Sequence, residues 1–171
     1  MILHDLGLRF NSPFVNLWIS PSDFIKMLGR LNYYMSCELV FEERNEMPYP
    51  VGLVDDIHIY FQHYKSEAEA KYMWDKRKKR INYNDLFVLF TDRDGCTSQN
   101  LIDFDSLPFK NKVCFVNKPA PSIKSAVYIR GFENETSVGR CMDYKSKFSC
   151  KKYYDDFNYV KWFNSSLEND I

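Results

Sequence analysis

The stretch Asp56–Gly95, DIHIYFQHYKSEAEAKYMWDKRKKRINYNDLFVLFTDRDG, has the pattern of a strand, a helix, a second strand and an acidic turn. The β-branched and aromatic run Ile57–Phe61 predicts the first strand. Ser66 and Glu69 have the spacing of a capping box, which predicts where the helix begins. Because Leu86–Phe90 is apolar at every position, it is predicted to be a central strand buried on both faces, as in a parallel sheet. The stretch therefore predicts a right-handed βαβ crossover.

The rest of the chain continues this alternation of helices and apolar strands. Further strands are predicted at residues 14–19, 39–42, 112–116 and 126–130, and helices at about 20–34, 97–104 and 153–163. The end of a helix, or a helical turn, is predicted in Ile2–Leu8, with Gly7 as its cap. The pattern predicts an α/β fold, namely a three-layer α/β/α arrangement with a mostly parallel central sheet. Residues 1–171 are predicted to form a single domain.

Composition narrows the class of protein. Of the 171 residues, 45% are hydrophobic and 27% are charged, as in globular domains. The formal net charge is zero, which argues against a dedicated nucleic-acid-binding protein. We find neither a signal peptide nor a transmembrane segment. The five cysteines form no CxxC pair, so reduced thiols in the cytoplasm are expected rather than disulfides or a zinc site.

The acidic turn after the second predicted strand is the first candidate site. Asp92 and Asp94 are two residues apart, with Arg93 between them and Gly95 following. Two carboxylates at this spacing can hold Mg²⁺ or Mn²⁺, which would neutralise a diphosphate leaving group, and metal-dependent glycosyltransferases use an Asp-x-Asp in this way. Arg93 is a candidate substrate contact. The alternative is a purely structural turn, with an aspartate accepting backbone N–H groups and Gly95 at positive φ.

His63 and Tyr64 follow the first predicted strand and form a second candidate group. Ligands bind beyond the carboxyl ends of parallel strands, so both groups are expected at one edge of the sheet. His63 is a candidate general base or phosphate contact, and Tyr64 a candidate substrate contact. The alternative is a hydrogen-bonded structural histidine.

Arg77 and Arg80 lie three residues apart on the predicted helix and share a face. Guanidinium groups suit bidentate contact with phosphate. The neighbouring lysines instead have the pattern of a solvated helix end. By the rise of an α-helix, Arg77 lies about 15 Å from the helix start, which separates it from the other candidates.

Other catalytic patterns have little support. The chain contains no GxSxG, GxGxxG or GxxxxGK[ST] motif. Cys96 directly follows the acidic turn, where carboxylates are expected to raise the pKa of its thiol and disfavour a nucleophilic thiolate.

Several segments together resemble a bacterial family, the domain of unknown function DUF1919. The segments are Phe10–Pro13, Tyr49–Gly52, Phe61–Tyr64, Glu69–Ala70, Trp74–Asn82, Asp92–Thr97 and Asn111–Lys112. The resemblance spans about Leu6 to Trp162 and implies an α/β fold. Members often bear exopolysaccharide or capsule biosynthesis labels, and similar proteins usually begin with an additional strand and a polar loop. No family catalytic residues can be carried over.

Three functions are consistent with these observations. The first is a cytoplasmic transferase of surface-polysaccharide biosynthesis that acts on an activated sugar or a glycan acceptor. The second is a non-catalytic glycan-binding or assembly-partner domain, in which exposed rings such as Tyr33, Tyr34, Tyr64 and Tyr83 stack on sugars. The third is an acyltransferase that modifies a glycan with His63 as base.

Overall fold

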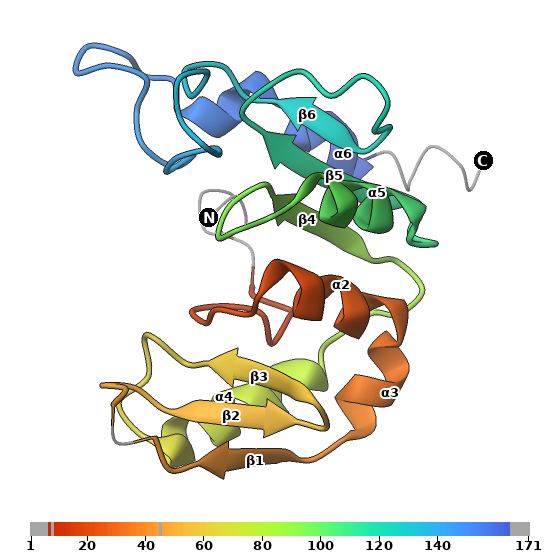
Figure 1. Cartoon of the computed structure of the whole chain (residues 1–171), viewed down its shortest axis with the longest axis vertical. Helices are drawn as coiled ribbons and strands as arrows, with labels where there is room; N and C mark the ends of the chain where they lie inside the picture. The colour runs from red at the N-terminus through yellow and green to blue at the C-terminus, as the bar shows by residue number, and fades with distance from the viewer. Residues whose placement is uncertain (1–6, 8, 45, 165–171) are drawn as a thin grey trace. The chain divides into compact units, whose positions relative to one another are not determined.

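The computed structural model describes residues 7, 9–44 and 46–164 (Figure 1). The predicted helical turn in Ile2–Leu8 lies outside these residues, except for Gly7. Contacts divide the chain into two compact units, which we call the N-terminal unit, Gly7–Tyr83, and the C-terminal unit, from Asn84 onward. The prediction of one domain is not tested by this division, and each unit is described by itself.

The N-terminal unit combines three helices with an antiparallel sheet of order β1-β2-β3. Its elements are α2 (Pro21–Gly29), α3 (Leu31–Ser36), β1 (Leu39–Glu42), β2 (Val51–Val54), β3 (Ile57–Tyr60) and α4 (Glu67–Lys78). A Cβ on Gly52, the second residue of β2, would lie 2.5 Å from Leu39 Cδ1, so a larger residue there would displace the buried Leu39 side chain.

Aromatic rings fill the core of this unit. Trp74 of α4 is 1% exposed and makes edge-to-face contacts with Phe14 and Phe61, with ring centroids 6.0 and 6.2 Å apart. Ala70, Trp74 and Arg77 are the buried residues of α4, and their spacing places them on one face of the helix. The helix therefore holds the Phe14 segment and the end of β3 together.

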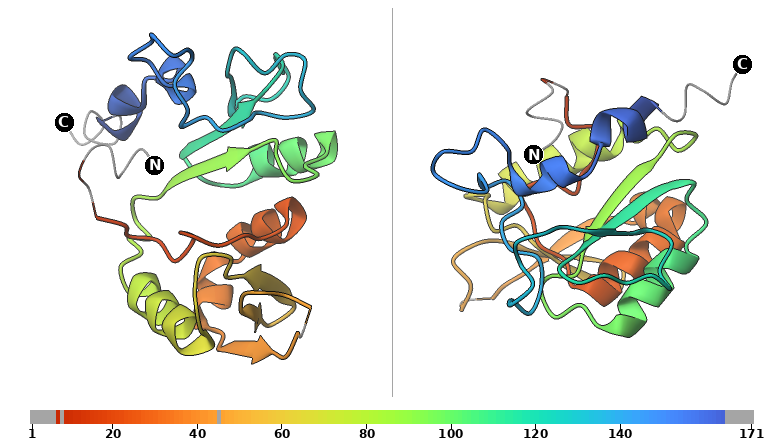
Figure 2. Two further views of the ribbon diagram at one scale, coloured as in Figure 1. Left: turned by 90° about the vertical axis from the view of Figure 1, so that its left-hand side faces the viewer. Right: turned by 90° about the horizontal axis from the view of Figure 1, so that it is seen from above.

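The C-terminal unit contains a parallel sheet of order β4-β5-β6. Its elements are β4 (Phe87–Thr91), α5 (Ser98–Ser106), β5 (Asn111–Val116), β6 (Ala126–Tyr128), the 3₁₀ helix η1 (Tyr153–Asp156) and α6 (Tyr159–Asn164). Phe90 stacks on Phe104 of α5, whereas Phe87 contacts Trp162 of α6. Because Phe87 and Phe90 alternate along β4, α5 and α6 cover opposite faces of the sheet, as Figure 2 also shows.

The predicted crossover through α4 is wrong. Strand β3 pairs with β2 in an antiparallel sheet, and β4 pairs with β5 in a different, parallel one. A two-residue turn of Asp55 and Asp56 joins β2 to β3, with Asp55 at φ 55°. Such a turn pairs adjacent strands directly, so β3 already has a partner and the sequence signal of a hairpin was missed. The parallel connection is instead β4–α5–β5.

The fold class is therefore confirmed only as mixed α/β. The described strands form two sheets of three, not one mostly parallel sheet, and the three-layer arrangement is not confirmed. Strand β4 lies at the edge of its sheet with alternating burial, and the central strand is β5, in which five of six residues are buried. The prediction that the Leu86–Phe90 strand is central is therefore wrong. Strand β4 has a neighbour on one side only, whereas β5 lies between β4 and β6.

The starts of α2, α4 and α5 were predicted correctly, but other boundaries differ. Ser20, Ser66 and Thr97 cap α2, α4 and α5 through their side-chain oxygens. The predicted helix 20–34 is broken at Arg30 into α2 and α3, and the predicted helix 153–163 is η1 followed by α6. The predicted strand 14–19 is reduced to a single bridge between Trp18 and Tyr60.

Candidate functional site

The carboxyl edge of the parallel sheet carries the acidic turn, and Asp92 is tied into it from several directions. Its backbone N–H donates to the Phe115 carbonyl at 3.0 Å. One carboxylate oxygen accepts the Asn117 backbone N–H at 2.8 Å, and the other accepts the Val138 N–H at 2.7 Å. Asp92 thus joins the end of β4 to the segments that follow β5 and β6, which is the structural alternative anticipated for this turn.

Asn117 extends this linkage across the same edge. The side chain is buried, and its amide nitrogen donates to the carbonyl oxygens of Phe132 and Glu135 at 3.2 and 2.6 Å. Asp92 and Asn117 together hold residues 132–138 beside the strand ends. Sequence analysis missed Asn117, although a polar residue directly after an apolar strand, at the carboxyl edge, is the signal that could have identified it.

Arg93 and Asp94 are exposed at the tip of the turn. The turn is closed by the Cys96 N–H, which donates to the Arg93 carbonyl at 3.1 Å, and Asp94 and Gly95 adopt φ of 59° and 83°. In the part of the chain that the structure describes, no three His, Cys, Asp or Glu side chains gather as metal ligands. A divalent cation at Asp94 would therefore depend on ligands from water or substrate, and the proposed Mg²⁺ or Mn²⁺ stays a prediction.

Cys96 has the unreactive character expected from its position. Burial, and secondly the Asp92 carboxylate, raise the pKa of the Cys96 thiol to about 11. The group is therefore a thiol at neutral pH, which disfavours a role as nucleophile.

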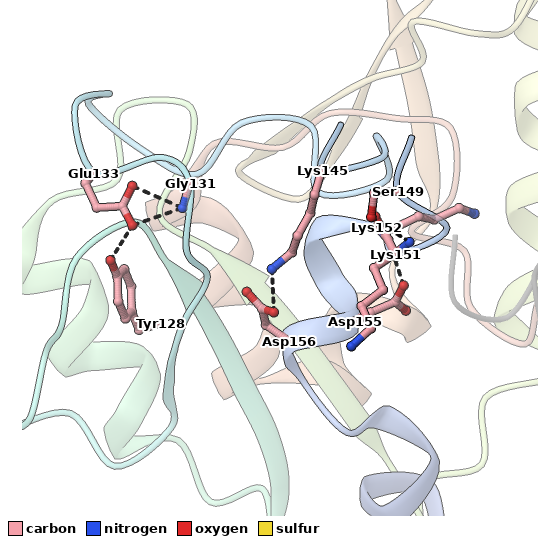
Figure 3. Close-up of polar contacts among 9 residues, drawn as sticks. All are labelled: Tyr128, Gly131, Glu133, Lys145, Ser149, Lys151, Lys152, Asp155 and Asp156. Carbon is pink, nitrogen blue, oxygen red and sulfur yellow. Dashed lines mark hydrogen bonds and ion pairs between the residues drawn. The ribbon is translucent and has the colours of Figure 1, made fainter. Parts of the chain in front are cut away.

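Glu133 closes the loop that follows β6 (Figure 3). Its carboxylate accepts the Tyr128 hydroxyl at 2.5 Å and the Gly131 N–H at 3.0 Å. These two donors, the Tyr128 hydroxyl foremost, lower the pKa of Glu133 to about 2. The carboxylate therefore stays ionised and bonded to both donors throughout the neutral range.

We expect Glu133→Gln to lower the melting temperature modestly near neutral pH. The folded-state pKa of about 2 lies below the usual 4.5, so the stabilising effect is present above 4.5 and is lost as the pH falls toward 2. The variant should therefore show a flatter decline of melting temperature across this window, measured by thermal unfolding at several pH values. Glu135→Gln, an exposed neighbour, is the control and should follow the wild type. Parallel curves for wild type and Glu133→Gln would contradict the assignment.

A second group of predicted residues centres on Arg77 of α4. Arg77 Nη1 donates to the Tyr64 hydroxyl oxygen at 2.7 Å and to the Val15 carbonyl at 3.2 Å. The Tyr64 hydroxyl in turn donates to the same carbonyl at 3.0 Å. The three groups form a closed triangle that fixes the Phe14–Val15 segment. Burial raises the pKa of Tyr64, so its hydroxyl is a stable donor at neutral pH.

Arg77 is unusual because it is buried without a counter-charge. The side chain is 7% exposed, and among the described residues no carboxylate lies within ion-pair distance of it. Both of its hydrogen bonds use Nη1, which leaves Nε and Nη2 without a described acceptor. Trp74 Nε1 is fully enclosed without a partner. Arg77 Nε and Nη2 are not among the described atoms that are both fully enclosed and without a partner, so these two nitrogens keep contact with solvent. Buried guanidinium groups are normally paired with an anion.

Arg80 and His63 occupy more exposed positions in the same unit. Arg80 Nη1 donates to the Phe10 carbonyl at 3.1 Å, so Arg80 also fixes the segment before α2. His63 lies in an exposed turn between β3 and α4, and the described residues offer its imidazole no orienting carboxylate. His58 is the histidine that approaches an acid, with Nε2 3.2 Å from Glu42 Oε2. A general base normally has such an orienting partner, so the geometry lends His63 little support.

The predicted site residues therefore fall into two groups. His63, Tyr64, Arg77 and Arg80 belong to the N-terminal unit, and Asp92, Arg93 and Asp94 to the C-terminal unit. The expectation that both groups lie at one edge of one sheet is wrong, because β3 and β4 belong to different sheets. Tyr34 and Tyr64 are buried, so they are not available to stack on a sugar, whereas Tyr33 and Tyr83 are exposed.

These features define a mixed α/β protein that has charged side chains at a parallel-sheet edge and, among the described residues, a buried arginine without a carboxylate partner. The chain belongs to the family described as domain of unknown function (DUF1919), whose model matches residues 1–164. It is similar to an uncharacterized protein of Haemophilus influenzae, with 50% identity over 163 residues, which are 95% of this chain and 78% of that protein. The family resemblance is thus confirmed. No helix among the described residues is long and apolar enough to cross a membrane.

Proposed function

We propose that the protein acts in bacterial surface-polysaccharide biosynthesis, as a transferase whose substrate is an activated, phosphate-bearing sugar. The observation that carries this proposal is Arg77, a buried guanidinium with no carboxylate partner and with Nε and Nη2 left to contact solvent. Two parallel N–H groups of one guanidinium match the geometry of a phosphate. Arg77 is the proposed phosphate anchor, and Arg80 the second cation of that group.

The Tyr64 hydroxyl and the Val15 carbonyl hold the guanidinium in place before a ligand arrives. Such preorganisation reduces the entropy that is lost on binding. Asp94 and Arg93 are proposed as further substrate contacts, separate from this anchor, because they are exposed at a strand end. Asp92 is assigned a structural role, since both its oxygens accept backbone N–H groups.

We expect Arg77→Lys to weaken phosphate-dependent ligand binding about tenfold or more, because lysine cannot donate two parallel hydrogen bonds. The measurement is a thermal-shift titration with UDP, inorganic phosphate and uridine. Ligand at about 100 times its dissociation constant stabilises a protein by about 2.7 kcal/mol, so the shift is measurable. UDP and phosphate should stabilise the wild type, and uridine should not.

Arg30→Lys is the matched control, because Arg30 lies over the Tyr33 ring in the same unit and has no proposed ligand role. Tyr64→Phe removes one support of Arg77 without changing charge and should weaken the UDP response less. A UDP response that is equal in wild type and Arg77→Lys, or one matched by uridine, would refute the phosphate anchor. Repeating the titration with Mg²⁺ and Mn²⁺ on Asp94→Asn tests the metal separately.

A second candidate, non-catalytic glycan binding, is favoured by one observation on α4. A groove of about 440 Å³ is lined by Ala68, Lys71, Tyr72, Asp75, Lys76 and Lys79. The Tyr72 ring is 61% exposed there, and Lys76 Nζ lies 5.0 Å from its centroid. An exposed ring beside cations suits an acidic sugar. Binding of a plain oligosaccharide that is lost in Tyr72→Ala, without any response to UDP, would favour this candidate. For the third hypothesis, acyl transfer with His63 as base, the geometry offers no specific support.

A further inference from the structure

We propose that residues 142–152, which we call the Phe148 loop, form a contact site for an anionic phospholipid bilayer. The loop is MDYKSKFSCKK and lies between β6 and η1. Figure 1 draws it in blue as a loop that extends away from β6. The inference does not depend on the phosphate anchor at Arg77, which belongs to the other unit.

The exposure of the Phe148 ring is the first observation. Phe148 is 99% exposed, and Met142 and Tyr144 in the same loop are 42% and 58% exposed. Single exposed apolar residues are common on proteins, but a fully exposed phenylalanine with two further apolar residues in one short loop is a recognised mark of an interaction site. Because no described residue covers the Phe148 ring, its transfer into an apolar phase would remove nearly its whole apolar surface from water.

Hydrogen bonds within the Phe148 loop fix its backbone, so the Phe148 ring lies on an ordered segment. Tyr144 and Lys152 form an antiparallel bridge, and the Lys145 N–H donates to the Lys151 carbonyl at 3.0 Å. The Ser149 N–H donates to the Ser146 carbonyl at 3.1 Å and closes a turn at the tip. Phe148 lies within that turn, which places it at the end of a hairpin-like loop.

The charge of the loop selects the partner. Residues 142–152 contain four lysines and one aspartate, a net charge of +3 in a chain whose overall charge is zero. Arg140 lies 3.6 Å from Asp143 and partly neutralises it. Lys145 pairs with Asp156 at 2.5 Å and anchors the base of the loop (Figure 3), whereas Lys147 and Lys151 form no ion pair with a described residue. Lys147 and Lys151, both exposed, therefore lie on either side of Phe148 in the sequence of the loop.

An aromatic ring between free lysines has the chemistry of a membrane-surface contact. The ring enters the boundary between headgroups and acyl chains, and the ammonium groups stay with the anionic headgroups. A protein partner is less suitable, because one short loop buries much less than the about 800 Å² per partner of a stable interface. Single-stranded nucleic acid would require several rings for successive bases within a basic groove.

The test is partition onto phospholipid vesicles, measured by co-sedimentation of the full chain. Vesicles containing about one third phosphatidylglycerol should bind the protein, and pure phosphatidylcholine vesicles should bind it far more weakly. Phe148→Ser should lower the partition coefficient about tenfold, by loss of ring insertion. Lys147→Glu/Lys151→Glu should lower it tenfold or more, since each lysine near such a surface contributes about fivefold. Binding of the wild type should weaken as salt is raised.

The matched controls are Tyr72→Ser and Lys76→Glu, which alter an exposed ring and an exposed lysine of α4. Both variants should bind vesicles like the wild type, and all variants should keep the wild-type circular dichroism spectrum. Absence of binding to the anionic vesicles overturns the proposal, as does an equal loss in the α4 variants. Tighter binding to single-stranded oligonucleotide than to vesicles, if removed by Phe148→Ser, would assign the loop to nucleic acid instead.

Discussion

Asp92→Ala is expected to lower the free energy of unfolding by about 2–4 kcal/mol, because it leaves two backbone N–H groups without acceptors. Those groups belong to Asn117 and Val138, which donate to Asp92 at 2.8 and 2.7 Å. Asn117 and Val138 are themselves buried, so water cannot fully replace the Asp92 carboxylate as an acceptor for their N–H groups. Urea-induced unfolding gives the energy, and hydrogen exchange should show faster exchange at the Asn117 and Val138 amides.

Two companion variants separate the structural role of Asp92 from a role in metal binding. Asp94→Ala should lower stability by less than about 1 kcal/mol, because Asp94 is exposed and makes no hydrogen bond among the described residues, and its φ of 59° is only somewhat less favourable for alanine. Asp92→Asn keeps one acceptor oxygen and should cost less than Asp92→Ala. Equal effects of Asp92→Ala and Asp94→Ala would show that the pair acts jointly, as a shared cation would require.

Trp74→Ala should destabilise the N-terminal unit by about 3–5 kcal/mol, the usual cost of removing a fully buried large ring. The indole lies between Phe14 and Phe61, and its loss would leave a cavity that neither ring can fill. Trp74→Phe should cost much less, since the smaller ring keeps part of the contact and also removes the buried Nε1–H that has no acceptor.

The control for this series is Tyr72→Ala on the exposed side of the same helix. It removes an aromatic ring that is 61% exposed, at a position where alanine is the better helix former, and should not destabilise the protein by more than about 0.5 kcal/mol. Chemical unfolding followed by circular dichroism measures all three variants. A cost of Trp74→Phe as large as that of Trp74→Ala would mean that the indole N–H has a partner in solution.

Local structure in this chain could be predicted because its causes are local. Ser20, Ser66 and Thr97 were identifiable as caps, since a capping side chain bonds an amide three residues further along. In the predicted capping box, Ser66 does accept the Glu69 N–H, but Glu69 bonds the Lys65 N–H instead of that of Ser66. The strands β1, β3, β4, β5 and β6 were also recognised, because apolar runs bounded by turn residues have few alternatives.

The candidate site could be predicted only as a set of residues. The turn that contains Asp92, Arg93 and Asp94 was found from its composition, but the partners of Asp92 are 25 and 46 residues away in the sequence. No periodicity or spacing indicates such contacts. For the same reason Tyr64 was expected to be exposed, whereas the Val15 carbonyl and Arg77 enclose its hydroxyl.

The sequence by itself determined the starts of α2, α4 and α5, most of the strands, the family and the mixed α/β class of this protein. The tertiary structure decided which strands share a sheet and that Arg77 is buried without an anion. It also decided that Asp92, at the carboxyl end of β4, is hydrogen-bonded to the segments that follow β5 and β6. The physical reason is the range of the interactions. Caps and strand propensity act over a few residues, whereas strand pairing, burial and charge compensation depend on segments that only the folded chain brings together.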